Sequence, residues 1–288
     1  MYAAMLNKKL VLAVNEAYLV RNNKKQLNGQ HYYCPHCKKR MILIVSQQKS
    51  AFFKHLNHYG NFMGEKEEHH SSKMALKAAL TAASFNAQVE VPLAAGQIRA
   101  DILASSNLAF EIQCAPLSKA EYNHRHALYK KENVKDIWIV GKRHFLRQKI
   151  KKTQLIFFRR NQLWREYYLE IDPIKQILRL KYNILLEPLT NKVHYQQINF
   201  SLDEVGIQNF WKFKPILHHY HINPVKQKQY LQLQIRQKSI KGIRIAKLLY
   251  EQKMTIDNLS SSVFKHFREI GSLDTATDYL LKLSANDS

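Results

Sequence analysis

Three short apolar or alternating runs between Gln88 and Gln113 constrain the fold of this chain more than any other feature. The runs are separated by Ala-Ala-Gly and by Ser-Ser-Asn. Short runs broken by turn residues predict a three-stranded meander. Because side chains alternate between the two faces of a strand, Asp101 on the middle strand and Glu111 on the next can reach the same surface. The meander can therefore bring two carboxylates and the amide of Gln113 together.

Both acids stand in sequence that is typical of a sheet interior, since apolar residues follow Asp101 and flank Glu111. Buried acids need a partner, which is either a basic side chain or a divalent cation such as Mg²⁺. An Asp, a hairpin connection and Glu-x-Gln resemble the core motif of PD-(D/E)xK nucleases, with Gln113 where lysine is most common. The alternative is that both acids only form ion pairs with Arg99 and nearby lysines.

Helices are predicted on both sides of the meander. Residues 65–85 begin acidic and are rich in Ala, Leu and Lys, which favours a helix. Ser118 followed by Glu121 is a capping-box signature for a second helix that extends to about Lys131, and residues 136–140 follow as a short buried strand. The order helix, three strands, helix, strand is similar to the whole restriction-endonuclease-like core. The predicted fold class is therefore α/β of the α+β type.

Seven segments in the first half of the chain share their residues and their order with a known family. They are YCPHC at 33–37, FFKH at 52–55, EH at 68–69 with Lys73, IRAD at 98–101, FEIQ at 110–113, residues 125–129 and IWI at 137–139. On these segments the chain resembles the CoiA-like nuclease family of naturally transformable bacteria. The resemblance implies a cytoplasmic protein that acts on incoming DNA, single-stranded or in recombination intermediates, with recombination proteins as partners.

The resemblance also implies roles for individual residues. Asp101 and Glu111 would bind Mg²⁺ or Mn²⁺, and Gln113 would complete the catalytic set by orienting water or a phosphate oxygen. Glutamine cannot supply the positive charge of lysine or act as a base, so a DNA-binding recombination accessory that does not cleave is the alternative. The residues expected to contact nucleic acid are Lys73, Arg99, Arg125 and Tyr129.

A CxxC knuckle in the first sixty residues predicts a zinc site. Cysteine and histidine are the preferred ligands of Zn²⁺, and four of them close a tetrahedral structural site. The alternative is that two reduced cysteines pack together without a metal. The candidate ligands are Cys34, Cys37, His55 and His58, with His31 and His36 as competitors for the fourth position.

The formal net charge of +23 is the outlier in an otherwise ordinary globular composition. A positive field of this size favours polyanions, and basic residues interleaved with aromatic ones favour nucleic acid. Three cysteines do not make a disulfide framework, and Asn15 and Glu16 interrupt the apolar run near the N-terminus. We therefore expect a reducing cytoplasm, no signal core and no membrane span. A third interpretation is an interaction adaptor whose charge is incidental.

Composition and pattern divide the chain into three expected domains. Residues 1–62 form a small β-rich region with the knuckle, 63–142 the nuclease-like core, and 143–288 a basic, mostly helical DNA-binding or accessory domain. The segments expected within the outer domains are strands at 10–14, 17–20 and 41–45, a hairpin of 168–172 with 177–182, and helices within 224–253, 263–270 and 275–283.

Overall fold

The computed structural model describes residues 2–7, 9–26, 30–35, 38, 40–45, 50–55 and 57–286, with the side chains of all of these except 54–66 and 286. The chain divides into two compact units, Met1–Glu67 and Glu68–Ser288. No helix in the described part of the chain is both long and apolar enough to cross a membrane.

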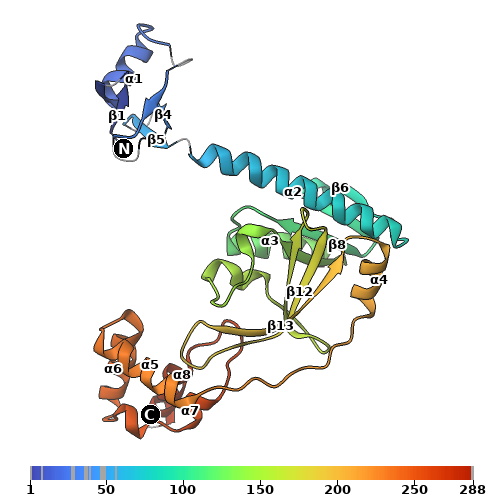
Figure 1. Ribbon diagram of the computed structural model, residues 1–288, viewed down its shortest axis with the longest axis vertical. Helices are drawn as coiled ribbons and strands as arrows, with labels where there is room; N and C mark the ends of the chain where they lie inside the picture. Colours follow the sequence, from blue (N-terminus) through green and yellow to red (C-terminus); the bar gives the residue numbers. More distant parts are fainter. Residues whose placement is uncertain are drawn as a thin grey trace. The chain divides into compact units, whose positions relative to one another are not determined.

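The N-terminal unit is a five-stranded antiparallel sheet with the strand order β2-β1-β3-β4-β5 and one helix, α1 (Figure 1). The buried carboxylate of Glu16 on α1 accepts a hydrogen bond of 2.5 Å from the hydroxyl of Tyr32 and also pairs with Lys25. The elements are β1 (Ala3–Leu6), β2 (Lys9–Leu12), α1 (Ala13–Arg21), β3 (Tyr32–Tyr33), β4 (Arg40–Ile44) and β5 (Phe52–His55).

The expected strand at 17–20 is wrong, because these residues belong to α1. Ala13, Ala17 and Val20 all pack into the core of this unit, and their spacing of four and three residues is that of a helix face. The strand expected at 41–45 is confirmed by β4, whereas the strand at 10–14 survives only as the end of β2.

The second unit is built on a mixed sheet with the order β13-β12-β11-β9-β8-β7-β6, and β10 pairs with β11. The predicted meander is confirmed, since β6, β7 and β8 are antiparallel neighbours. β9 lies parallel between β8 and β11. The strands are β6 (Gln88–Leu93), β7 (Ile98–Ser105), β8 (Leu108–Gln113), β9 (Lys135–Val140), β10 (Arg159–Asn161), β11 (Arg165–Asp172), β12 (Ile177–Leu186) and β13 (Val193–Ser201).

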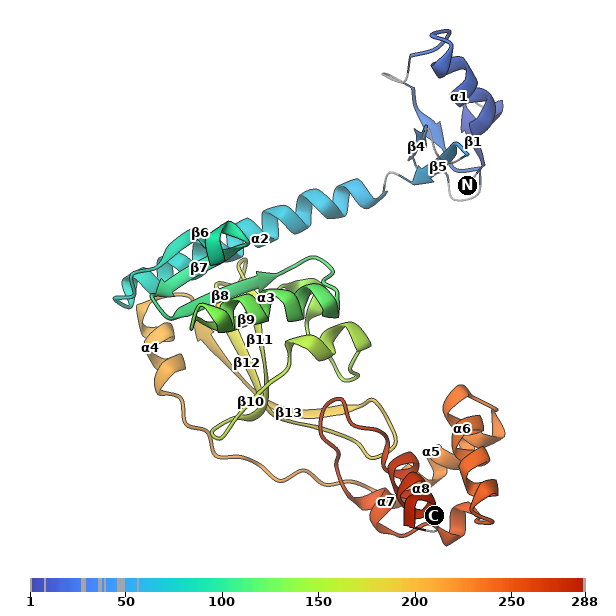
Figure 2. The ribbon, with the colours of Figure 1, turned by 180° about the vertical axis from the view of Figure 1, so that it is seen from behind.

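Helices cover both faces of this sheet (Figure 2). α2 (Asn57–Ala82) and α4 (Glu204–Lys212) share one hydrophobic core with β8 through Phe110 and Ile112. α3 (Lys119–Lys131) packs against the other face, where Ala109 of β8 lies in a second core. Alternation along β8 therefore sends its apolar residues to both cores and turns Glu111 toward α3.

The expected domain boundary at residue 142 does not separate two folds. β11 pairs with β9 through Glu170 and Val140, and β12 and β13 extend the same sheet. The predicted hairpin of 168–172 with 177–182 is confirmed as β11 and β12. Its basic residues are partly interior, because Lys181 is buried beside Glu170. Residues 143–201 thus belong to the central sheet, and the helical part of the chain begins only at α4.

The C-terminal helices form a lobe with its own apolar core, to which Leu231, Ile245 and Leu280 contribute. A turn with Lys238 at a φ of 51° separates the first two helices. The expected helix at 263–270 is mostly wrong, because Arg268 forms an isolated bridge with Leu186 of β12. The helices of this lobe are α5 (Pro224–Arg236), α6 (Ile240–Glu251), α7 (Ser262–Lys265) and α8 (Thr275–Asn286), with the 3₁₀ turn η4 (Ile256–Asn258). Three further 3₁₀ turns lie earlier in the chain: η1 (Ala94–Gly96), η2 (Lys142–His144) and η3 (Lys152–Phe157).

Candidate active site

The site begins where β7 and β8 separate. The last paired residues on this side are Ile102 of β7 and Phe110 of β8. Beyond them, the side chain of Asp101 takes the place of a backbone partner for β8. Its Oδ2 accepts a 2.9 Å hydrogen bond from the backbone amide of Ile112. A side-chain oxygen thus satisfies an amide that would otherwise lack a strand partner. This contact fixes the carboxylate of Asp101 beside Glu111.

Glu111 is almost completely buried, with 1% of its side chain exposed, and α3 supplies both of its partners. Arg125 Nη2 lies 2.5 Å from Glu111 Oε2, and the hydroxyl of Tyr129 donates to Oε1. The two donors are four residues apart and therefore share one face of the helix. The side chain of Ser118 caps the N-terminus of α3 by accepting from the amide of Glu121.

A contact with β9 orients Arg125. Its guanidinium carbon lies 5.3 Å from the ring centroid of Trp138, a buried residue of β9. The indole of Trp138 in turn donates a 2.6 Å hydrogen bond to Asp136. A cation above an aromatic face is attracted by the ring, so β9 holds Arg125 in place while leaving 24% of its side chain exposed.

The pKa values of the two carboxylates shift in opposite directions. Burial, and then the charge of Asp101, raise the pKa of Glu111 to about 8, against the opposing effects of Arg125 and Tyr129. Burial also acts to raise the pKa of Asp101, but its contacts with His69, Ile112 and Lys73 outweigh burial and lower that pKa. Two close acids whose pKa values are driven apart are typical of catalytic and metal-binding carboxylate pairs.

α2 supplies the partners of Asp101. His69 Nε2 lies 3.2 Å from Oδ2, and Lys73 Nζ lies 3.8 Å from Oδ1. Lys73 also forms an ion pair with Glu90. Glu90 has a φ of 56° and is skipped in the β6–β7 pairing, although Val89 with Ile102 and Val91 with Ala100 keep the same register on either side of it. A positive φ at a residue other than glycine is a local irregularity of the strand, and it occurs at the residue that pairs with Lys73.

The residues expected to act on nucleic acid divide by exposure. Arg99 is 67% exposed, and together with Arg125 it is accessible from solvent. Lys73 has only 8% of its side chain exposed and is held by Glu90. Tyr129 is completely buried, so the expected contact with nucleic acid is replaced by its hydrogen bond to Glu111.

Gln113 does not point its amide at the acid pair. Its Nε2 donates a 2.8 Å hydrogen bond to the carbonyl of Ala115, where β8 leaves the sheet. His144 Nε2 lies 2.9 Å from the same carbonyl oxygen. The side chain of Gln113 is neutral, and its oxygen can only accept hydrogen bonds. It therefore cannot replace the positive charge of a lysine.

Glu68 is a residue of the site region whose role the sequence did not indicate. Its Oε1 accepts a 2.7 Å hydrogen bond from the amide of Lys142, at the end of β9. A Cβ at Gly141 would lie 2.8 Å from this oxygen and 2.6 Å from the sulfur of Cys114. The glycine therefore permits the close approach of α2 to the strand ends. In the sequence, only the position of Glu68 directly before His69 could have indicated that it lies near the site.

The chemistry of this donor set fits a divalent cation. Mg²⁺ is commonly bound by one or two carboxylates, with water and phosphate oxygens completing its shell, so two carboxylates from neighbouring strands suffice. No group of three or more His, Cys, Asp or Glu side chains suited to a metal occurs among the residues that the structure describes. Of the predicted zinc ligands, Cys34 is buried in the N-terminal core, and Cys37 and the side chains of His55 and His58 lie outside the described residues.

The chain was compared with known proteins. A family model described as "Competence protein CoiA, nuclease-like domain" matches residues 65–215. The matched range contains the acid pair, α3, the whole central sheet and α4, and it extends past the expected boundary at residue 142. No curated protein and no solved structure matched the chain.

Proposed function

The chain belongs to the family of competence protein CoiA, whose nuclease-like domain it carries, and from this premise we propose that it is a metal-dependent DNA phosphodiesterase. Its task is the processing of incoming DNA during natural transformation and recombination. The observation that carries the proposal is the pair of the partly buried Asp101 and the buried Glu111, because the charge of Asp101 acts with burial to raise the pKa of Glu111. The order of helices and strands around the pair supports a restriction-endonuclease-like core.

Asp101 and Glu111 would hold Mg²⁺ or Mn²⁺. The positive charge of the ion would stabilise the negative charge that develops on the phosphate, and the ion would lower the pKa of a bound water. Glu111 has to give up its ion pair with Arg125 in exchange, or share it. His69 and Lys73 keep Asp101 ionised through the contacts that lower its pKa.

The remaining side chains position the substrate. Arg125 and Arg99 are accessible cations beside the pair, and Arg125 Nη2 lies 3.4 Å from the carbonyl of Arg99. Arg125 and Arg99 would contact the phosphate, as a lysine would do if it stood at position 113 instead of glutamine. Tyr129 orients Glu111 from the buried side. For the N-terminal unit we retain the proposal of a structural Zn²⁺ bound by Cys34 and Cys37 with histidine ligands.

The test is cleavage of labelled single-stranded and double-stranded DNA by the purified protein in Mg²⁺ or Mn²⁺. Asp101→Asn and Glu111→Gln remove one charge each, and we expect either substitution to lower the cleavage rate by at least about a hundredfold. Glu251→Gln is the matched control, because this exposed acid on α6 forms its one ion pair within the described part of the chain with Lys247, four residues away. Equal rates for the parent and both site variants would refute the proposal.

The second candidate function is DNA binding without cleavage in recombination. Two observations favour it: the amide of Gln113 is tied to Ala115, and Arg125 already neutralises Glu111. In that case the parent binds DNA with the same affinity with and without metal, and no product forms at any metal concentration. A metal-dependent product from the parent that is lost with Asp101→Asn decides for the nuclease.

A further inference from the structure

A cavity of about 340 Å³ lies between the segment at 150–155, the turn after β12 and the helical lobe. It lies entirely within the unit Glu68–Ser288. Most of its charged lining is positive. The charged residues that line it are Lys151, Lys152, Lys241, Arg244, Arg268 and Asp274.

The single carboxylate of this cavity is fully engaged. Asp274 is buried, and its Oδ2 lies 2.7 Å from Arg244 Nη2. The same side chain accepts hydrogen bonds from the amide and the hydroxyl of Thr277 at 2.9 and 3.0 Å. Asp274 therefore forms its ion pair with Arg244 and acts on Lys241 and Arg268 only through longer-range attraction, so positive charge remains in excess in this cavity.

Lys241 and Arg268 donate to neutral carbonyl groups. Lys241 Nζ lies 2.6 Å from the carbonyl oxygen of Leu189, and Arg268 Nη2 lies 2.7 Å from that of Thr190. No carboxylate in the described part of the chain lies within ion-pair distance of either side chain. Both cations are about half withdrawn from water, so their fixed charges attract an anion more strongly than freely solvated lysines do.

The electrostatics agree with this geometry. Burial lowers the pKa of Lys241, and the nearby charges of Arg268 and Arg244 lower it further, against the effect of Asp274. Burial lowers the pKa of Arg268 as well. These side chains repel one another, and a bound anion relieves that repulsion.

Lys151 also lines a second cavity of about 370 Å³, together with Arg143 and His144. Pro116 and Leu117, which follow β8 in the chain, line the same cavity. His144 contacts the carbonyl of Ala115, which also accepts from Gln113 at the end of β8. Two adjoining cavities with basic side chains therefore lie between the end of the strand that carries Glu111 and the helical lobe.

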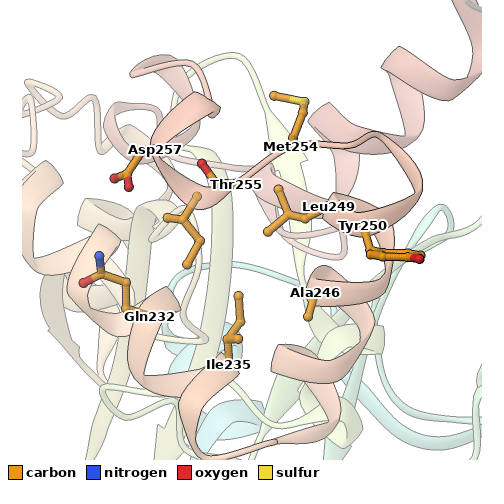
Figure 3. A pocket seen from close by; sticks show the side chains of 9 residues that line it. Gln232, Ile235, Ala246, Leu249, Tyr250, Met254, Thr255 and Asp257 are labelled. Carbon is orange, nitrogen blue, oxygen red and sulfur yellow. The ribbon is translucent and has the colours of Figure 1, made fainter.

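A pocket of about 420 Å³ on the outside of the same lobe shows the contrast (Figure 3). Side chains such as Ile235, Leu249 and Met254 line it, and its lining includes Asp257 but no basic residue. An anion has no partner there. Nothing in the structure identifies what would cover this apolar pocket.

We propose that the cavity lined by Lys151, Lys152, Lys241 and Arg268 binds a phosphate group of a nucleic-acid strand whose neighbouring segment lies in the candidate active site. The assignment to a strand rests on the proposed function, whereas the anion site itself does not. Cations that contact phosphates position a strand without reading its sequence. The binding is therefore sequence-tolerant and weakened by salt.

The test is binding of fluorescent single-stranded DNA in a metal chelator, where cleavage cannot occur. The pocket variant is Lys152→Gln with Lys241→Gln, and the control is Lys247→Gln with Lys282→Gln. The control removes the same charge from exposed residues that pair with acids four positions away. We expect about tenfold weaker binding by the pocket variant, with a salt slope smaller by about 0.7 for each lost contact. The control should stay within about twofold of the parent.

Equal losses in the pocket variant and the control, or no loss in either, would overturn the proposal. Because Lys241→Gln also removes a hydrogen bond to Leu189, Lys151→Gln with Lys152→Gln at exposed positions serves as a second pocket variant. Weaker binding by this pair as well supports the site.

Pyrophosphate separates the two sources of phosphate. If it competes with DNA for the parent but not for the pocket variants, the strand assignment is supported. If it raises the melting temperature of the parent alone while all variants bind DNA equally, the ligand is free phosphate and the strand assignment is overturned. Failure of cleavage in Mg²⁺ refutes the nuclease and leaves these binding results unchanged.

Discussion

Glu111→Gln should stabilise the folded protein, and the gain should grow with pH. The pKa of Glu111 rises from its ordinary value of 4.5 to about 8 on folding, first through burial and then through the charge of Asp101. The folded protein therefore holds this proton more tightly than the unfolded chain does. The stabilisation that comes from this bound proton is fully present below pH 4.5. It decreases progressively as the pH rises to about 8 and is absent well above that value.

The magnitude follows from the size of the shift. Each pKa unit corresponds to about 1.4 kcal/mol, so ionised Glu111 lowers the free energy of unfolding by up to about 5 kcal/mol. Rearrangement of Arg125 and entry of water reduce this figure, and we expect a gain of at least about 2 kcal/mol at about pH 9. The gain should be under about 1 kcal/mol at about pH 5, because Glu111 is then protonated in the folded state. The amide oxygen of Gln can still accept from Tyr129.

The assay is urea unfolding followed by tryptophan fluorescence at several pH values, without divalent metal. Trp138 is buried beside Arg125 and reports on this region. Glu251→Gln, at an exposed position, should show no pH-dependent gain. Added Mg²⁺ should stabilise the parent and not Glu111→Gln, since binding to the folded state alone raises stability.

A Glu111→Gln variant that follows the parent at every pH, or that is less stable at about pH 9, would refute this reasoning. The ion pair with Arg125 would then outweigh the burial of the carboxylate and the repulsion from Asp101. A stabilised variant that no longer cleaves DNA would instead separate loss of activity from loss of folding.

Three other substitutions test the framework of the site by the same unfolding assay. Gly141→Ala places a Cβ 2.6 Å from the sulfur of Cys114 and 2.8 Å from Glu68 Oε1 and should lower the free energy of unfolding by about 1–3 kcal/mol; an unchanged value would show that both side chains can move aside. Glu170→Gln leaves the buried Lys181 without a countercharge and should reduce stability by about 3–5 kcal/mol, which a loss below 1 kcal/mol would contradict. Ser118→Ala removes the N-cap of α3 and should reduce stability by about 1 kcal/mol, as measured beside Ser118→Thr, which keeps the cap.

The sequence was sufficient for the meander and its acids, because a period of two and turn residues are local signals. Asp101 and Glu111 do come together on adjacent strands. The partners that control them were not predictable in detail. The ion pair of Glu111 with Arg125 depends on how α3 packs on the sheet, and the positive φ of Glu90 is set where β6 pairs with β7.

The second half of the sheet was misread as accessory sequence for a related reason. Arg179 and Lys181 appear as surface residues in the sequence, but the register of β11 with β12 places them around the buried Glu170. Cross-strand compensation of charge is visible only once the register is known. Residues 17–20 were misassigned because Val20 and its apolar neighbours suit a strand as well as a helix when the run is short.

The position of β9 in the middle of the sheet has a practical consequence for anyone who wishes to isolate the nuclease-like domain. A fragment that stops at residue 142 would remove β11 and leave β9 as a bare edge, with Ile137, Ile139 and Val140 in a strand of open amides and carbonyls. Unprotected apolar edges recruit other chains and aggregate. The smallest fragment expected to fold therefore has to run through β13 and α4, so the nuclease-like domain cannot be cut at residue 142.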